Sequence, residues 1–124
     1  MAQMKLGEVE SRFADLIWKN EPVSSRRLSE LAEEALGWKR TTTYTVLKRL
    51  CDRGLFRNES GRVTSLVSRS EFYALQSEKF VEETFDGSLP AFVAAFTRRG
   101  DLRKEDIDAL QAMIDRYRKE ADHD

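Results

Sequence analysis

The chain is 124 residues long with a formal net charge of −1, and its 40% hydrophobic and 35% charged residues fit one domain, or one compact domain with an oligomerisation segment. No apolar run approaches the ~20 residues of a membrane-spanning helix and the N-terminus lacks the apolar stretch of a signal peptide, so we expect a cytoplasmic protein without membrane insertion. One cysteine, Cys51, and one histidine, His123, exclude an internal disulfide and argue against a metal site or another cofactor.

A first helix is predicted from about Gly7 to Lys19, because apolar residues recur there at helical spacing. Glu8 and Glu10 lie near its positive N-terminal end, where a carboxylate is favourable. The segment that ends at Pro22 stops this helix.

A second helix is predicted after Ser24, which suits an N-cap, and it stops at Gly37. Val23, just before the cap, is a candidate for a short strand. Val23 and Leu28 also occupy the two positions of a hydrophobic staple.

A third helix, from about Thr41 to Arg53, is predicted to carry two different faces, and Gly54 ends it. One face points outward and carries hydroxyls and cations, and no acidic residue occurs from residue 39 to residue 51. Such groups contact phosphates and base edges, so this is a candidate DNA-recognition helix. The face expected to be buried consists of Thr43, Val46, Leu47 and Leu50.

Two β-prone runs, residues 55–59 and 62–67, follow on either side of Ser60-Gly61 and predict a hairpin. Three helices and then a hairpin is the order of a winged helix-turn-helix domain. In that fold the third helix enters the major groove and the wing lies along the DNA backbone. Local charge agrees, because residues 39–62 hold seven Lys and Arg against two Asp and Glu.

The rest of the chain is predicted to be helical, over about residues 70–85, 88–96 and 103–119, with Ser70 and Ser88 as N-caps. These helices carry more apolar surface than so short a segment can bury by itself, so we expect a second copy of the chain to cover it. A symmetric dimer also places two recognition helices on the two half-sites of a palindrome.

We therefore predict a mainly α fold with a small β-hairpin, divided into a winged helix-turn-helix DNA-binding domain at residues 1–68 and a helical dimerisation domain at residues 69–124. In the last helix, apolar residues at steps of 3, 4 and 3 form a heptad-like seam. The candidate dimerisation residues are Phe80, Phe85, Phe92, Phe96, Ile107, Leu110, Ile114 and Tyr117.

The predicted DNA-binding residues belong to the third helix and the wing. Thr41 and Thr42, near the helix N-terminus, suit phosphate, whereas Thr45 and Arg49 suit a thymine methyl and a guanine edge. For Arg62 two interpretations stay open, a phosphate contact or an ion pair with Glu59 across the hairpin. The full set is Lys39, Arg40, Thr41, Thr42, Tyr44, Thr45, Lys48, Arg49 and Arg62.

No arrangement of residues indicates catalysis, since the chain has no phosphate loop, metal cluster or Ser-His-Asp set. We expect no enzyme activity and assign no catalytic residue. Trp18 and Trp38 are predicted to pack, and Cys51 is predicted to be a buried structural thiol. The alternative function is a winged helix that binds protein, against which the basic third helix argues.

An ordered set of short segments runs along the chain, and together they resemble the penicillinase-repressor family, the winged-helix repressors of β-lactamase and methicillin-resistance genes, with copper-responsive repressors as relatives. The resemblance covers nearly all of residues 6–119. Its segments are Asp15-Leu16-Ile17-Trp18, Pro22-Val23-Ser24, residues 38–50, Gly54-Leu55, Gly61-Arg62-Val63, residues 85–89, residues 91–96 and residues 102–110.

The resemblance implies a homodimer on a palindromic operator that blocks transcription until an inducer acts. In the β-lactam branch, a membrane sensor metalloprotease triggers cleavage at an Asn-Phe pair; the matching pair here is Ala95-Phe96, which keeps the phenylalanine only. In the copper branch, a Cys-x-Cys pattern near the C-terminus binds metal, and this chain has no cysteine after Cys51. Proteolysis, a metal and a small ligand all stay open as inducing signals.

Overall fold

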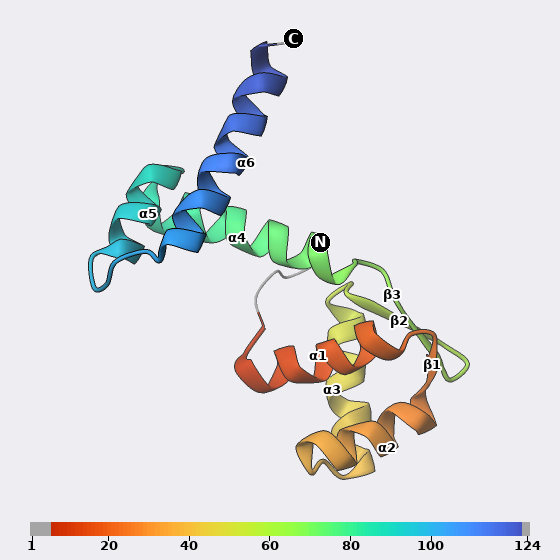
Figure 1. The fold of residues 1–124 in the computed structure, drawn as a ribbon. Coiled ribbons are helices and arrows are strands. Elements are labelled where there is room, and N and C mark those ends of the chain that lie inside the picture. Colours follow the sequence, from red (N-terminus) through yellow and green to blue (C-terminus); the bar gives the residue numbers. More distant parts are fainter. Residues whose placement is uncertain (1–5, 123–124) are drawn as a thin grey trace. The chain divides into compact units, whose positions relative to one another are not determined.

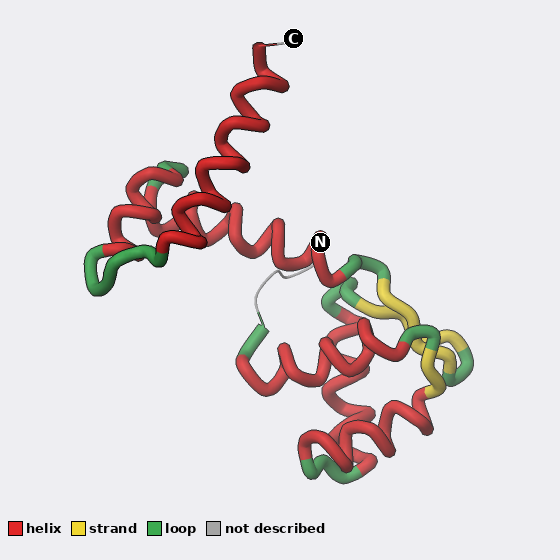
Figure 2. The backbone as a smooth tube through the Cα atoms, viewed as in Figure 1, coloured by secondary structure: helices red, strands yellow, loops and turns green. Residues whose placement is uncertain are grey.

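The computed structural model describes residues 6–122 as two compact units that divide near residue 80 (Figure 1). The N-terminal unit holds α1 (Glu8–Asn20), β1 (Val23–Ser24), α2 (Ser25–Leu36), α3 (Arg40–Asp52), β2 (Phe56–Glu59), β3 (Arg62–Ser65) and the first part of α4 (Arg69–Phe85). The C-terminal unit holds the end of α4, α5 (Leu89–Thr97) and α6 (Lys104–Asp122). The predicted fold class is confirmed, because the described chain is mainly helical and its strands form one small sheet (Figure 2).

The three short strands form one antiparallel sheet in the order β1-β3-β2. The predicted hairpin is β2 and β3, joined by Ser60 and Gly61 with φ angles of 51° and 86°. Two positive φ values are typical of a type I′ turn, which fits the right-handed twist of the strands. The short strand expected at Val23 is also present and pairs with Val63 of β3.

The core of the N-terminal unit takes residues from every one of its elements. The face of α3 that was predicted to point inward is confirmed, because Thr43, Val46, Leu47 and Leu50 are its buried residues. Their opposite neighbours on the same helix stay exposed. The buried apolar residues are Leu6, Phe13, Ala14, Ile17, Val23, Leu28, Ala32, Val46, Leu47, Leu50, Leu55, Phe56, Val63 and Phe72.

Both tryptophans pack against this core, as predicted. Trp18 lies 5.7 Å from Phe72 of α4 between ring centroids, and its Nε1 donates a hydrogen bond of 2.9 Å to the carbonyl of Val67. Trp38 lies 5.0 Å from Phe13. A buried indole N–H needs such a partner. The bond to Val67 therefore fixes the chain just before α4.

The N-caps follow the sequence with one exception. The Ser24 and Ser88 hydroxyls each accept the backbone N–H three residues later, as expected for α2 and α5. The predicted Ser70 cap is wrong, because α4 starts at Arg69 and Ser68 is the residue whose hydroxyl accepts the N–H three residues on. Two serines in Ser-Arg-Ser offer the same chemistry, and the earlier cap extends the helix so that the N–H of Phe72 bonds the Ser68 carbonyl.

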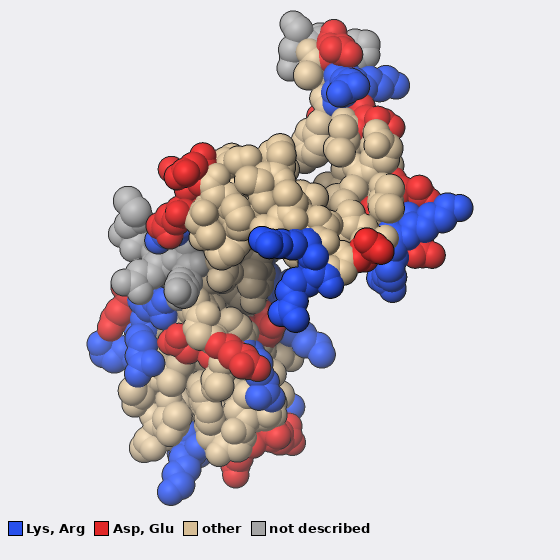
Figure 3. Space-filling model, turned by 90° about the vertical axis from the view of Figure 1, so that its left-hand side faces the viewer, with Lys and Arg blue, Asp and Glu red and all other residues tan. Residues whose placement is uncertain are grey.

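The C-terminal unit has contacting rings but almost no interior. Phe92 lies 5.7 Å from Phe85 and 6.2 Å from Phe96 between ring centroids. Neither α5 nor α6 contains a buried residue, and the surface over α5 is nearly free of charged side chains (Figure 3). The exposed large apolar residues of the C-terminal unit are Leu89, Val93, Phe96, Ile107, Leu110, Met113, Ile114 and Tyr117.

No helix in residues 6–122 is long and apolar enough to cross a membrane. His123, the one histidine of the sequence, lies outside the described residues.

Candidate nucleic-acid interface

The outer face of α3 is polar, cationic and exposed. Lys39 is the N-cap of this helix, and its side chain makes no hydrogen bond to the first turn. The first N–H groups of the helix are therefore not occupied by the cap, and with the helix dipole they attract an anion. The predicted DNA-binding residues on this exposed surface are Lys39, Arg40, Thr41, Thr42, Tyr44, Thr45, Lys48 and Arg49.

Two of these side chains have partners within α3. Lys48 Nζ lies 3.1 Å from Asp52 Oδ2, and both side chains are largely exposed. An exposed pair of this kind contributes little and is screened by salt, so Lys48 remains able to contact phosphate. Thr45 Oγ1 donates to the carbonyl of Thr41 at 2.9 Å, which leaves its methyl group and acceptor lone pairs for another molecule.

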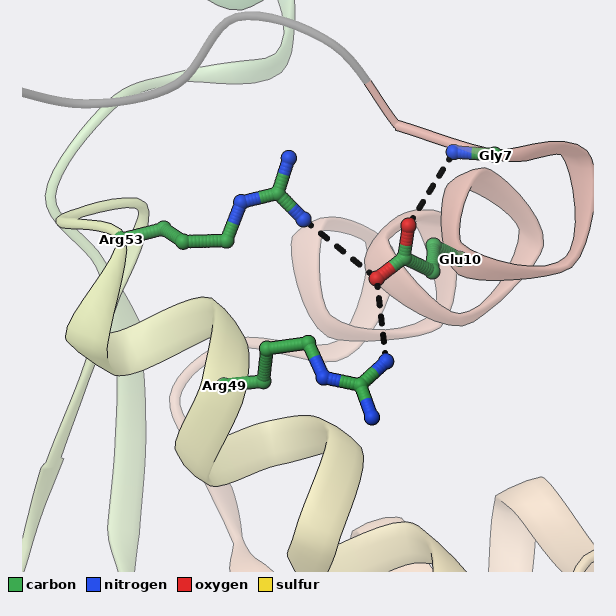
Figure 4. A network of polar contacts seen from close by, with 4 residues as sticks. All are labelled: Gly7, Glu10, Arg49 and Arg53. Carbon is green, nitrogen blue, oxygen red and sulfur yellow. Dashed lines mark hydrogen bonds and ion pairs between the residues drawn. The ribbon is translucent and has the colours of Figure 1, made fainter.

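Arg49 makes an ion pair with α1 (Figure 4). Its Nη1 lies 3.6 Å from Glu10 Oε2, and Nη1 of Arg53 lies 3.3 Å from the same oxygen. The other oxygen of Glu10 accepts the backbone N–H of Gly7 at 3.1 Å. The sequence placed Glu10 only at a favourable helix start. Its second role depends on how α1 packs against α3, which the local pattern does not contain.

The wing turn is attached to the start of α2. Ser25 donates its backbone N–H to the carbonyl of Gly61 at 2.7 Å. Arg62 is exposed next to this turn and lies opposite Glu59 in the hairpin register. In the described residues, however, the ion pair of Glu59 is with Arg57 of its own strand, at 3.4 Å. The cross-hairpin interpretation of Arg62 is therefore not the one that the structure supports.

An open groove of about 530 Å³ lies between α3 and the wing. Two of the predicted DNA-binding residues, Tyr44 and Lys48, line it. Its two uncharged polar residues, Ser25 and Asn58, were not among the predicted DNA-binding residues, since a serine and an asparagine give no signal in a sequence until the fold places them in the same groove as Lys48. The lining residues are Ser25, Tyr44, Leu47, Lys48, Cys51 and Asn58.

Cys51, predicted to be a buried structural thiol, is partly buried in the wall of this groove. Burial, and after it the charge of Asp52, raises the pKa of the thiol above its ordinary value. The thiol therefore stays protonated at neutral pH, as a packing residue does.

Comparison with known proteins decides the family. The sequence model of the penicillinase repressor family matches residues 6–116. The chain belongs to the penicillinase repressor family. One relative is the penicillinase repressor of Bacillus licheniformis, which is 23% identical over an alignment of 118 residues, and the alignment covers 92% of each chain. The predicted resemblance is thereby confirmed, and the family is one of regulatory proteins rather than enzymes.

In this member of the penicillinase repressor family, the residues predicted for cleavage lie near the C-terminal end of α5. Ala95 and Phe96 are both exposed, and Phe96 is 68% exposed. The α6 residues predicted for dimerisation, Ile107, Leu110, Ile114 and Tyr117, are 40–68% exposed. Over residues 6–122, no group of three or more His, Cys, Asp or Glu could hold a metal ion.

Proposed function

We propose that this protein is a cytoplasmic transcriptional repressor that binds a palindromic operator in double-stranded DNA as a homodimer. The observation that carries the proposal is the outer face of α3, where residues 39–51 expose cations and hydroxyls and no carboxylate. Membership of the penicillinase repressor family supports the same role. Repression follows from occupancy, because a dimer that covers promoter DNA excludes the transcription machinery.

In this proposal α3 enters the major groove. Thr41 and Thr42 meet phosphate near the open helix N-terminus, while Thr45 and Arg49 face base edges. Arg62, the exposed cation beside the wing turn, meets phosphate on the outer side of the groove. Phosphate contacts fix the position of the protein, and the base contacts select the sequence.

The homodimer is supported by the C-terminal unit. Its helices α5 and α6 bury no residue, although they carry many large apolar side chains. A monomer rarely leaves large apolar patches exposed to water. Pairing with a second copy covers this surface and gives the two-fold symmetry that a palindrome requires.

Cleavage by a membrane sensor metalloprotease is one route to induction, and the structure sets a condition on it. Ala95 and Phe96 are both exposed, but the bond between them lies inside α5. Cleavage therefore requires the C-terminal end of α5 to open locally. A short helix without buried residues opens readily, so the condition is one that α5 can meet.

The proposal is tested by titrating the protein against a labelled promoter duplex at increasing salt. If a dimer makes about 6–10 phosphate contacts, affinity should fall roughly 10³–10⁵-fold between 50 and 200 mM salt. An affinity that stays flat over this range, or no binding to any duplex, contradicts the proposal and favours a protein-binding module.

A further inference from the structure

Three charged side chains connect the start of α1 to the recognition helix α3 (Figure 4). One carboxylate oxygen of Glu10 lies 3.3 Å from Nη1 of Arg53 and 3.6 Å from Nη1 of Arg49. The other oxygen accepts the N–H of Gly7 at 3.1 Å. The Glu10 side chain is only 23% exposed. The carboxylate is thus held in place from both sides.

The two arginines are held differently. The Arg53 side chain is 16% exposed, whereas the Arg49 side chain is 56% exposed and lies farther from the carboxylate. If Arg49 leaves, Glu10 still has Arg53, so no half-buried carboxylate is left unpaired. Arg49 is therefore the exchangeable partner, and Arg53 is the permanent one.

Lys48, the next cation on the same helix, has a different kind of partner. Its ion pair with Asp52 joins side chains that are 78% and 64% exposed, one turn apart on α3. Water and salt screen that pair strongly. A phosphate can take Lys48 from Asp52 easily, but it must compete with a fixed carboxylate for Arg49.

Resting on the DNA-binding role proposed above, we propose that Glu10 is a specificity-determining residue that competes with DNA phosphates for Arg49. A phosphate contact only replaces the ion pair of Arg49 with Glu10 by another ion pair. Non-specific DNA therefore gains little binding free energy from Arg49. A guanine edge offers two acceptors in the geometry of the guanidinium fork. Glu10 therefore suppresses binding to random sequence more than binding to an operator with a guanine at the matching position.

The test is Glu10→Gln, which keeps a side-chain oxygen for the Gly7 N–H and removes the charge that holds Arg49. The probes are a random-sequence duplex and a duplex enriched from a random library by the wild-type protein. With the random duplex, the slope of log affinity against log salt should steepen by about 0.9 per protomer, the value of one added phosphate contact. The ratio of affinities for the two duplexes should fall several-fold.

Glu8→Gln is the matched control, because it removes the same charge from the same turn of α1. Glu8 is exposed and, in the part of the chain that the structure describes, makes no ion pair with α3. Any effect of net charge alone appears equally in both variants. Equal slopes and equal affinity ratios for Glu10→Gln and Glu8→Gln overturn the inference. In that case a steep fall of wild-type affinity with salt still supports the proposed function.

The competition must also act through Arg49. In an Arg49→Ala background, Glu10→Gln should change the slope no more than Glu8→Gln does, and an undiminished effect overturns the inference. A second measurement does not depend on the folding of any Glu10 variant. It is the slope of log affinity against log salt for the single Arg49→Ala protein with the random duplex. This slope should equal the wild-type slope, because Glu10 keeps Arg49 from phosphate in the wild type, and a decrease by about 0.9 per protomer overturns the inference. If neither the wild type nor any variant binds either duplex, the proposed function fails and this inference with it.

Discussion

Thr43 shows how a single residue of α3 serves the core. It is fully buried, and in the described residues its Oγ1 has no hydrogen-bond partner. A buried hydroxyl without a partner costs about 1–3 kcal/mol. Thr43→Val, which removes this hydroxyl and keeps the shape, should therefore raise the free energy of unfolding by about 1 kcal/mol, measured by urea denaturation.

The control for this prediction is Thr43→Ser, which keeps the hydroxyl and loses the methyl group. It should lower the free energy of unfolding by about 1 kcal/mol, the value of one buried methyl group. If Thr43→Val destabilises the protein instead, the hydroxyl has a partner and the prediction is wrong.

Lys48 and Arg49 are adjacent and both exposed, yet they should respond differently to replacement. Arg49→Ala removes a candidate for bidentate guanine contact and should relax sequence preference at one position of each half-site, by about 1–3 kcal/mol. Lys48→Ala should weaken binding to all sequences about equally and reduce the salt slope. Binding to a library of single-base operator variants measures both effects, and an equal loss of specificity in both proteins contradicts this division.

At the scale of residues, the sequence predicted which side chains point into the core or into solvent, but not which side chains contact one another. The inward position of Thr43 and the outward position of Lys48 follow from helical periodicity alone. The contact of Glu10 with Arg49 and Arg53 joins two helices that are far apart in the sequence. Such a contact depends on the angle at which α1 crosses α3, and no local pattern encodes that angle.

The wing turn requires a left-handed backbone conformation at Gly61. Gly61 has a φ of 86° in the hairpin turn, a conformation that costs a residue with a Cβ about 1–2 kcal/mol. A Cβ there has ordinary room, with Ser25 Oγ as its nearest contact at 3.6 Å. Gly61→Ala should therefore lower the free energy of unfolding by about 1 kcal/mol through backbone strain, as measured by thermal or urea denaturation.

Gly100→Ala is the matched control for the wing. Gly100 has no positive φ, and a Cβ there meets nothing within 4 Å. It should leave the free energy of unfolding almost unchanged. Equal stability of the two variants shows that the turn relaxes without strain, contrary to the prediction.

At the scale of elements, two of the three N-caps predicted from the sequence are confirmed. Ser24 and Ser88 both accept the expected backbone N–H, although a second serine, Ser25, follows Ser24 directly. Between Ser68 and Ser70 the pattern was ambiguous, and tertiary contacts around Trp18 and Phe72 accompany the earlier start. The strand at Val23 was a weak signal, since its partner Val63 lies far away in the sequence and local patterns do not encode such a pairing.

For the whole molecule, the two units differ in what completes them. The N-terminal unit has a continuous core to which α1, α2, α3 and the sheet contribute. The C-terminal unit has ring contacts from Phe85 to Phe96 but no buried residue in α5 or α6. The sequence predicted this difference, because the helices after residue 69 carry more apolar residues than so short a segment can bury by itself. Helical periodicity shows that a helix has an apolar face, but it does not show what covers that face.

The seam of α6 gives the prediction that concerns the whole assembly. Ile114 is 52% exposed and stands in the middle of the heptad-like series from Ile107 to Tyr117. A charge there has to lose its hydration if two copies pack through this face. Ile114→Asp should therefore convert a micromolar dimer into a monomer in sedimentation, without loss of helical content.

Ala112→Asp is the control, since it adds the same charge to α6 at an exposed position on the side away from the seam. It should remain a dimer. The Ile114→Asp monomer should also bind an operator duplex much more weakly than the dimer does, because a second recognition helix tethered to the first acts at high effective concentration. The prediction is wrong if the wild-type protein sediments as a monomer at micromolar concentration, or if the Ile114→Asp protein stays dimeric. Either result shows that two copies of the chain do not pair through this seam.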